Sequence, residues 1–210
     1  MRIAFDLWGT LMCANPEFRT RRVDLFKKYF SDEPVLEVYG DMMDTVKKQL
    51  NNIIEPTGWM PNQKLIRTFI AASLNTDEER VYKFMQDYQR LAILYPPTFI
   101  DPDTPKILSW LAKDHGLYII SNTMFIEGDT LTEILKQKGV DDYFKGYGFS
   151  DNMKISKPNP AIFTYDLDYM IGDNVQTDGG FARAKNIKFI QINSNDKTLK
   201  DAYDIITSNR

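Results

Sequence analysis

Short apolar runs alternate with helix-like segments along the first few residues and the second half of the chain. The runs that we predict to be strands are Ile3–Leu7, Leu117–Ile120, Gly146–Phe149, Tyr169–Ile171 and Phe189–Ile192. The segments with helical spacing of apolar residues are Thr104–Asp114, Glu127–Lys138, Pro160–Tyr165, Thr177–Lys185 and Leu199–Ile206. Strands separated by helices favour a parallel sheet that is covered by helices on its faces.

A long block with helical spacing interrupts this alternation between about Pro16 and Tyr95. Three prolines in it, Pro16, Pro34 and Pro61, stand where helices are expected to begin, because a proline at a helix start loses no backbone hydrogen bond. A run of Asn, Thr, Asp and Glu at residues 75–79 is a helix-start signal for a fourth helix, which ends near Tyr95. We therefore predict an all-helical insertion after the first strand.

The composition removes several kinds of catalysis. Among 210 residues there is one histidine, His115, and one cysteine, Cys13, so a two-histidine metal site, an internal disulfide and a cysteine zinc cluster are excluded. The chain has 29 acidic and 26 basic residues, and its net charge of −3 gives no reason to expect nucleic acid as a partner. No apolar run reaches the length of a membrane span, and residues 1–5 lack a signal-peptide core, so a cytoplasmic location is expected.

Polar side chains of complementary type follow the predicted strands. They are Asp6, Ser121, Lys157, Asp173 and Asp178. The carboxyl ends of parallel strands meet at one edge of the sheet, where ligands bind in such folds. A carboxylate there can act as a nucleophile, paired acids suit Mg²⁺, and a lysine with a hydroxyl can stabilise a transferred oxyanion.

Four motifs occur in one order around these residues. They are FDLWGTL at residues 5–11, IISN at 119–122, SKPNPAIF at 156–163, and IGDN at 171–174 with Asp178 and the sequence GGFARAKN behind it. In this order the chain resembles the haloacid dehalogenase-like (HAD) hydrolase superfamily. The resemblance spans nearly all of the chain outside the helical block.

The resemblance implies a role for each motif residue. Asp6 is the expected nucleophile, and Asp6, Asp173 and the Trp8 backbone carbonyl are the expected ligands of Mg²⁺. Ser121 and Lys157 are expected to stabilise the transferred group. Asp178 is expected to orient Lys157 or a metal-bound water. The residues expected to contact the substrate are Thr10, Ser121, Asn122 and Lys157.

The same resemblance gives the helical block a meaning. It resembles a C1-type α-helical cap, which closes over the site, excludes water and selects the substrate. The expected organisation is a Rossmann-like α/β core of residues 1–13 and 97–210, with an all-α cap of residues 14–96. The expected partner is a small, anionic substrate, with no nucleic acid and no membrane.

Trp8 departs from the pattern of the family's phosphatases. Many of them carry an acid at this position that protonates the leaving group, and an indole cannot do so. An aromatic residue there resembles the dehalogenase branch, whereas Asp173 belongs to the metal-binding pattern that dehalogenases usually lack. A short interval of ten residues from Phe163 to Asp173 is a second departure, and it makes the placement of Lys157 less certain than that of Asp6.

Three functions remain open at this point. The first is a Mg²⁺-dependent phosphohydrolase that prefers good leaving groups, such as acyl phosphates. The second is a metal-independent dehalogenase-like hydrolase, with Arg19 as the group that binds a substrate carboxylate. The third is a catalytically weak binding protein.

The basic residues of the first predicted helix are otherwise interpreted as a solvated face. They are Arg19, Arg21, Arg22, Lys27 and Lys28.

Overall fold

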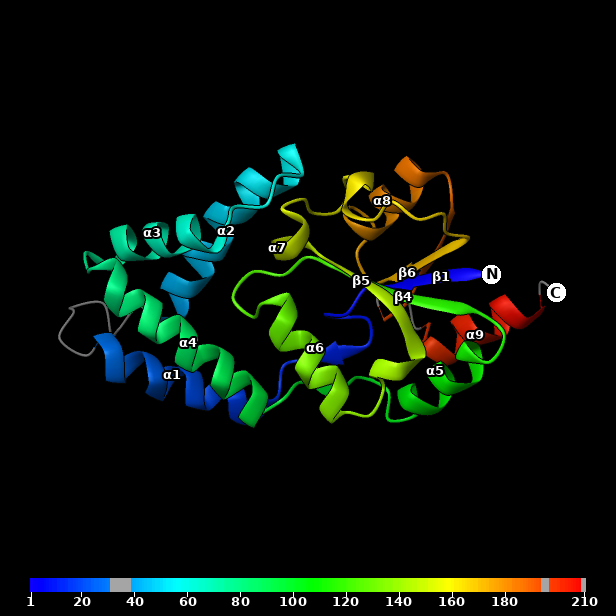
Figure 1. Cartoon of the computed structure of the whole chain (residues 1–210), viewed down its shortest axis with the longest axis horizontal. Coiled ribbons are helices and arrows are strands. Elements are labelled where there is room, and N and C mark those ends of the chain that lie inside the picture. Colours follow the sequence, from blue (N-terminus) through cyan, green and yellow to red (C-terminus); the bar gives the residue numbers. More distant parts are fainter. Residues whose placement is uncertain (31–38, 194–196, 209–210) are drawn as a thin grey trace.

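A five-stranded parallel sheet with helices on both faces forms one half of the protein, and four helices form the other (Figure 1). The computed structural model describes residues 1–30, 39–193 and 197–208. The main-sheet strands are β1 (Arg2–Phe5), β4 (Gly116–Ser121), β5 (Phe144–Phe149), β6 (Tyr169–Gly172) and β7 (Lys188–Gln191). The helices outside the insertion are α5 (Thr104–Ala112), α6 (Gly128–Gln137), α7 (Ser150–Met153), α8 (Asp178–Lys185) and α9 (Leu199–Ser208).

The strand order places β1 in the middle of the sheet. The order is β5-β4-β1-β6-β7, and all four pairings are parallel. Ile3 pairs with Leu117 on one side and with Tyr169 on the other. The carboxyl ends of β1, β4 and β6 therefore lie next to one another, as the motif order requires.

Successive residues of a strand point to opposite faces, and the two faces are buried by different helices. Ile3 and Phe5 belong to the larger apolar cluster, together with residues of α5, α6 and α9. Ala4 belongs to a smaller cluster with Phe181 and Ala182 of α8. Burial on both faces explains why these strands are continuous apolar runs without alternating polar residues.

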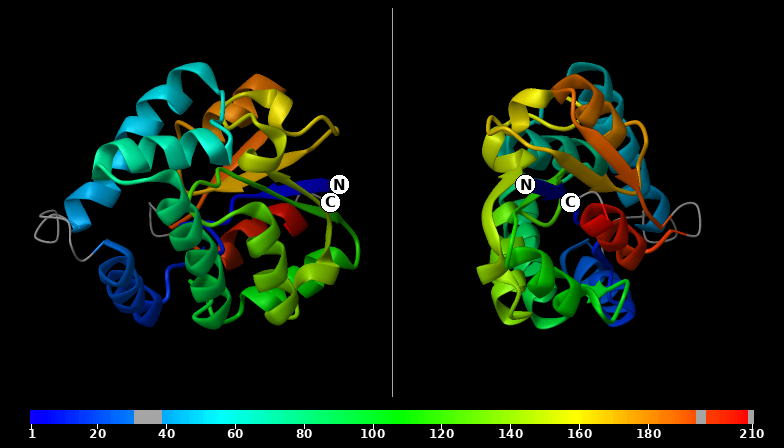
Figure 2. Two further views of the ribbon diagram at one scale, coloured as in Figure 1. Left: turned by 60° about the vertical axis from the view of Figure 1, so that its left-hand side comes forward. Right: turned by 90° about the vertical axis from the view of Figure 1, so that its right-hand side faces the viewer.

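The four remaining helices gather at the carboxyl ends of the strands, and we call them the helical layer (Figures 1 and 2). They are α1 (Pro16–Phe30), α2 (Tyr39–Thr57), α3 (Gln63–Leu74) and α4 (Glu78–Leu94). A small antiparallel pair joins β2 (Met12–Cys13) to β3 (Thr98–Phe99), where the chain enters and leaves this layer. Two segments far apart in sequence are thereby held together at the junction.

Most of the predicted elements are present, with ends that differ by a few residues. The third helix begins at Gln63 with Asn62 as its cap, two residues after the predicted start at Pro61. Residues 160–165, predicted as a helix, form only a 3₁₀ turn at Pro160–Ile162. The short elements β2, β3, α7 and the 3₁₀ turn at Asp141–Tyr143 were not predicted, and Pro34 lies outside the described residues. No helix within the described ranges is long and apolar enough to cross a membrane.

Asp87 of α4 links α4 to α1 through charged hydrogen bonds. Its carboxylate accepts a hydrogen bond of 2.7 Å from the Tyr29 hydroxyl and one of 3.0 Å from Lys28 Nζ. These two donors hold the pKa of Asp87 below its usual value. A carboxyl whose pKa is depressed in the folded state stabilises the fold above its unfolded-state pKa, and the contribution is lost as the pH falls through the folded-state pKa.

We predict that Asp87→Asn lowers the free energy of unfolding by about 0.5–1.5 kcal/mol at pH 7. The difference from the unmodified protein should shrink as the pH falls below about 4, where the carboxyl is protonated in the unfolded chain. Urea unfolding at several pH values measures both effects. Asp24→Asn, at an exposed position of α1, is the control for charge removal. An equal loss of stability at low and neutral pH would contradict the assignment.

Candidate active site

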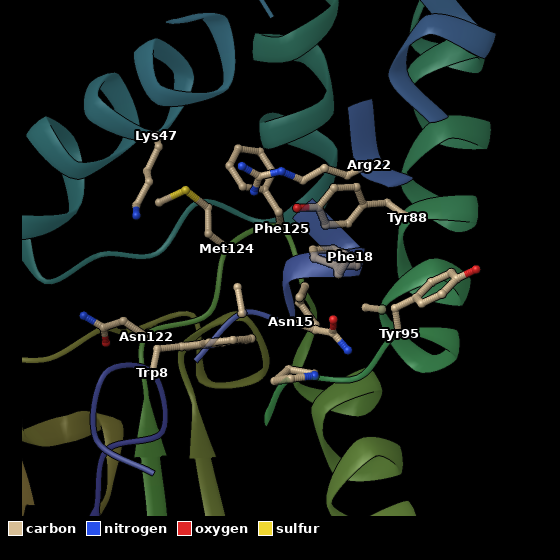
Figure 3. A pocket seen from close by; sticks show the side chains of 14 residues that line it. Trp8, Asn15, Phe18, Arg22, Lys47, Tyr88, Tyr95, Asn122, Met124 and Phe125 are labelled. Atoms are coloured by element: carbon tan, nitrogen blue, oxygen red, sulfur yellow. The ribbon is translucent and has the colours of Figure 1, made fainter. Parts of the chain in front are cut away.

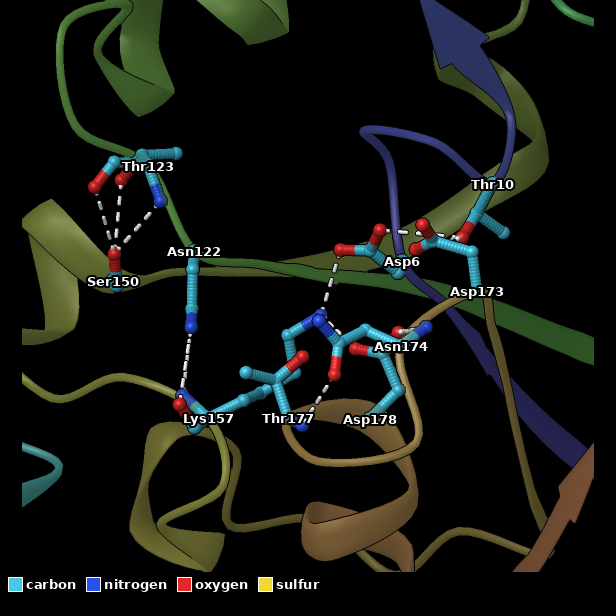
Figure 4. A network of polar contacts seen from close by, with 10 residues as sticks. All are labelled: Asp6, Thr10, Asn122, Thr123, Ser150, Lys157, Asp173, Asn174, Thr177 and Asp178. Atoms are coloured by element: carbon cyan, nitrogen blue, oxygen red, sulfur yellow. Dashed lines mark hydrogen bonds and ion pairs between the residues drawn. The ribbon is translucent and has the colours of Figure 1, made fainter. Parts of the chain in front are cut away.

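Three carboxylates that are far apart in sequence meet at the carboxyl edge of the sheet. Asp6 directly follows β1, Asp173 directly follows β6, and Asp178 is the first residue of α8. One carboxylate oxygen from each lies within 4.8 Å of the others. Figure 4 shows the three side chains converging from these separate elements.

Lys157 lies between two of these carboxylates. Its Nζ donates hydrogen bonds to Asp6 Oδ1 at 2.7 Å and to Asp178 Oδ1 at 2.6 Å, and the residue is only 1% exposed. Burial by itself would lower the pKa of Lys157, but the charges of Asp178 and Asp6 outweigh it and raise the pKa. Lys157 is therefore a fixed cation, and the short interval that follows it in sequence does not displace it from the site.

Burial and neighbouring carboxylates raise the pKa values of two of these acids, Asp6 and Asp173. Burial raises the pKa of Asp6 from 3.8 to about 6, although Lys157 acts in the opposite direction. Burial, and then the charge of Asp178, raise the pKa of Asp173. Of the three carboxylates, only Asp6 and Asp178 pair with the Lys157 ammonium group, so the cluster carries excess negative charge. Oxygen donors in this arrangement match the ligand preference of Mg²⁺. The donor set therefore fits a hard divalent cation.

Asn122 fixes the main chain at Lys157. Its side-chain amide donates to the Lys157 carbonyl at 3.0 Å, and its Oδ1 accepts a hydrogen bond of 2.8 Å from the Lys157 backbone N–H. The connection between α2 and α3 also holds this segment, since Ser156 N–H donates to the Gly58 carbonyl at 2.9 Å. In this arrangement both polar ends of the Asn122 amide are engaged by Lys157, which favours a positioning role over substrate contact.

Ser121 and Thr10 place hydroxyl groups beside the carboxylates. Ser121 Oγ is completely buried and has no hydrogen-bond partner among the residues that the structure describes. A buried hydroxyl in this state can donate to an oxygen of a bound ligand. Thr10 Oγ1 lies 3.2 Å from Asp6 Oδ2 and 3.4 Å from Asp173 Oδ1, so it contacts the acids and links the two strand ends.

The loop after Asp6 turns tightly around Gly9. Gly9 has φ +79°, and a Cβ at this position would lie 2.5 Å from Asp173 Oδ2. The loop is held by hydrogen bonds to the carbonyls of Leu7 and Met12 and by the Asn193 amide, which donates to the carbonyls of Gly9 and Thr10. None of these bonds uses the Trp8 carbonyl, which stays available as an oxygen ligand.

The glycine of the last motif has a similar steric role. A Cβ at Gly172 would lie 2.2 Å from Asp178 Oδ2, so only glycine lets this carboxylate reach the strand end. The same Oδ2 accepts a hydrogen bond of 3.1 Å from the Asn174 backbone N–H. Asp178 is therefore fixed on both oxygens, one by Asn174 and the other by Lys157.

A cavity of about 270 Å³ opens above these groups. Its floor contains Asp6, Ser121, Lys157, Asp173 and Asp178, and residues of α2 line another part of it. The residues from α2 are Lys47, Asn51 and Ile54. Residues of the helical layer thus form part of the cavity wall.

The structure corrects the interpretation of the basic residues on α1. Arg19 is exposed and lines neither the site nor the cavity beside it, so it is not placed to bind a substrate carboxylate. Arg22 lines the adjoining cavity instead. The sequence contained a signal for this, because Phe18, Arg22 and Phe26 recur every four residues and share one helix face, and both phenylalanines are buried.

Comparison of the sequence with known families agrees with the motifs. The haloacid dehalogenase-like hydrolase family matches residues 1–184 of the chain. The match covers far more than half of the sequence and includes all four motifs. The protein therefore belongs to the haloacid dehalogenase-like hydrolases, as the resemblance predicted.

Solved structures share its fold at low sequence identity. The HAD-hydrolase YfnB of Bacillus subtilis, described as bound to magnesium, aligns with a TM-score of 0.71 and 18% identity over 98% of each chain. A HAD phosphatase from Thermococcus onnurineus has a TM-score of 0.63 and 18% identity over 98% of this chain and 97% of its own. The L-2-haloacid dehalogenase of Xanthobacter autotrophicus has a TM-score of 0.58 and 16% identity over 100% of this chain and 83% of its own. A search of curated proteins found no match. At these identities the structures establish the fold and not the reaction.

We predict that Gly9→Ala costs about 1–3 kcal/mol more stability than Gly139→Ala. Both glycines have a positive φ, +79° and +68°, but a Cβ at Gly139 meets no atom within 4 Å. The matched pair separates backbone strain from the collision with the Asp173 carboxylate. Urea unfolding of both variants measures the difference, and equal losses would contradict a close packing of Gly9 against Asp173.

Proposed function

We propose that this hydrolase is a Mg²⁺-dependent phosphatase that uses Asp6 as its nucleophile and acts on a small phosphorylated metabolite. The observation that carries the proposal is the cluster of Asp6, Asp173 and Asp178, which have oxygens within 4.8 Å of one another. The Lys157 ammonium pairs with only Asp6 and Asp178. A dehalogenase that works without metal has no evident need for the excess negative charge at Asp173.

Asp6 is suited to attack phosphorus. Its Oδ1 is held by Lys157 and its Oδ2 lies near Thr10 Oγ1, so the carboxylate is oriented before the substrate binds. Lys157 opposes the rise in the Asp6 pKa that burial causes, which favours the ionised, nucleophilic form. Asp178 keeps Lys157 in place through its hydrogen bond of 2.6 Å.

Asp6, Asp173 and the Trp8 carbonyl would hold Mg²⁺. When bound, the ion offsets the repulsion between the carboxylates and the negative phosphoryl oxygens. The magnesium-bound Bacillus subtilis structure and the phosphatase from Thermococcus onnurineus, which share this fold, support this assignment.

Ser121 and Lys157 supply donors for the phosphoryl oxygens. The buried Ser121 hydroxyl gains a hydrogen-bond acceptor when a phosphoryl group occupies the cavity. Lys157 Nζ adds positive charge at the same position, and Asn122 keeps the Lys157 main chain fixed. Ser121 and Lys157 are therefore assigned to the transferred group, and Asn122 and Thr10 to positioning.

The reaction proceeds by two displacements at phosphorus. In the first, an Asp6 oxygen forms a bond to phosphorus while the bond to the leaving-group oxygen breaks, and that oxygen keeps the electron pair. In the second, a water oxygen attacks phosphorus and the bond to Asp6 breaks, which releases inorganic phosphate and a proton. Trp8 cannot protonate the leaving group, so the enzyme favours leaving groups that are stable as anions.

The helical layer acts as the cap of this site. Lys47, Asn51 and Ile54 of α2 lie along the cavity, and Trp59 pairs with Ile155 just before the Lys157 motif. A layer in this place shields the phosphoenzyme from bulk water and contacts the leaving group.

We predict that the purified protein releases phosphate from acetyl phosphate in the presence of Mg²⁺ and that EDTA abolishes the release. Asp6→Asn should reduce turnover by at least about a thousandfold, because the nucleophile is removed. The exposed Asp142→Asn is the matched control and should retain full activity.

Parallel assays with 2-chloropropionate distinguish the alternatives. Halide release that persists in EDTA, without phosphate release, would establish the dehalogenase function instead. Neither product, together with thermal stabilisation of the protein by phosphate, would indicate a binding protein.

A further inference from the structure

A second cavity, of about 300 Å³, adjoins the catalytic one, and we call it the cap pocket (Figure 3). Both cavities are lined by Trp8, Lys47, Asn122 and Met124. These shared residues make the cap pocket a continuation of the site, with Trp8 at the junction. A substrate whose phosphoryl group lies at Asp6 therefore directs its leaving group into the cap pocket.

Aromatic rings form much of its lining. Besides Trp8 from the core, Phe18, Tyr88 and Tyr95 come from the helical layer and Phe125 from the loop before α6. Phe18 and Tyr88 meet edge to face with their ring centres 5.3 Å apart. Walls of this kind favour a flat, ring-containing ligand.

The charged side chains that line the cap pocket are all positive. Arg22 and Lys47 line the cap pocket, and no acidic residue among the described ones does. Arg22 Nε is buried without a hydrogen-bond partner, whereas another part of the guanidinium interacts with the Tyr88 hydroxyl. None of the described acids forms an ion pair with this side chain. Figure 3 shows the Arg22 guanidinium beside Tyr88 and Phe125, at the end of the pocket opposite Trp8. A buried N–H donor without a partner is costly, so this end of the pocket suits an anionic acceptor.

The missing acid at position 8 selects the same kind of leaving group. A phenol has a pKa of about 10, so an aryl oxygen can leave as the anion without help from an acid. An alkanol is a much weaker acid and depends far more on protonation. Trp8 cannot protonate the leaving group, and its indole ring can pack against another ring. Both properties favour an aryl leaving group.

We propose that the substrate class is an aryl phosphate with a carboxylate on its ring, and that Arg22 is the residue that selects the carboxylate. The inference rests on the proposed phosphatase function. The ring lies in the cap pocket next to Trp8, and the carboxylate receives hydrogen bonds from the Arg22 guanidinium. An Asp6 oxygen bonds to phosphorus, the bond from phosphorus to the aryl oxygen breaks, and the phenolate leaves with the electron pair and takes a proton from water.

The test compares 4-carboxyphenyl phosphate with phenyl phosphate by the ratio of their kcat/KM values in Mg²⁺. The ratio is expected to exceed ten in the unmodified protein and to fall about tenfold to a hundredfold in Arg22→Met, through KM more than kcat. Arg22→Lys should restore part of the preference for 4-carboxyphenyl phosphate. Arg19→Met, which removes an exposed arginine from the same helix, should leave the ratio unchanged.

A measurement on the unmodified protein keeps the test valid if the Arg22 variants do not fold. The product 4-hydroxybenzoate should inhibit the hydrolysis of phenyl phosphate at least ten times more strongly than phenol. Phosphate release from both substrates with no preference for the carboxylate, or equal effects of Arg22→Met and Arg19→Met, overturns the substrate assignment and leaves the phosphatase intact. No phosphate release from either substrate or from acetyl phosphate overturns both.

Discussion

The site depends on one buried ammonium group held between two carboxylates. Lys157 has almost no contact with solvent, and an ammonium without partners at this depth would be lost to deprotonation. Asp6 and Asp178 keep it charged, and Lys157 in turn keeps them from repelling each other. Asp6 follows β1, Lys157 lies between α7 and the 3₁₀ turn at Pro160–Ile162, and Asp178 begins α8. The attraction between the three side chains therefore depends on the packing of these three segments.

The charge balance around this group explains what the site can do. One ammonium does not neutralise three carboxylates. Burial first, and then repulsion from neighbouring carboxylates, raise the pKa values of Asp6 and Asp173. In the proposed reaction, a bound divalent cation would offset the excess negative charge and permit the approach of a phosphoryl group. In that proposed reaction, Trp8 limits hydrolysis to leaving groups that depart without protonation. The same side chain separates the charged floor from the aromatic cap pocket, so it links the chemistry to the choice of substrate.

The motifs could be predicted because their chemistry is local. Gly9 and Gly172 are required where a carboxylate approaches the backbone, and such requirements appear as short sequence patterns. From the sequence, Arg22 is interpreted as part of a solvated face, because a charged residue in a basic run is usually solvated. In the structure it lines the cap pocket. Its placement depends on the face of α1 that packs against α4, and the spacing to Phe18 and Phe26 was the only trace of it in the sequence.

The sequence by itself determined the class of fold, the order of the functional residues at the strand ends, and that no site can be built from two histidines or two cysteines of this chain. Periodicity and composition carry this information because they reflect which residues are buried and which groups exist. Only the tertiary structure decided that Asn122 holds the Lys157 main chain, that α2 lines the catalytic cavity, and that Arg22 enters the cap pocket. Asn122 and Lys157 are 35 positions apart in sequence, and both cavities are lined by residues from several elements. The packing of whole helices and loops sets these distances.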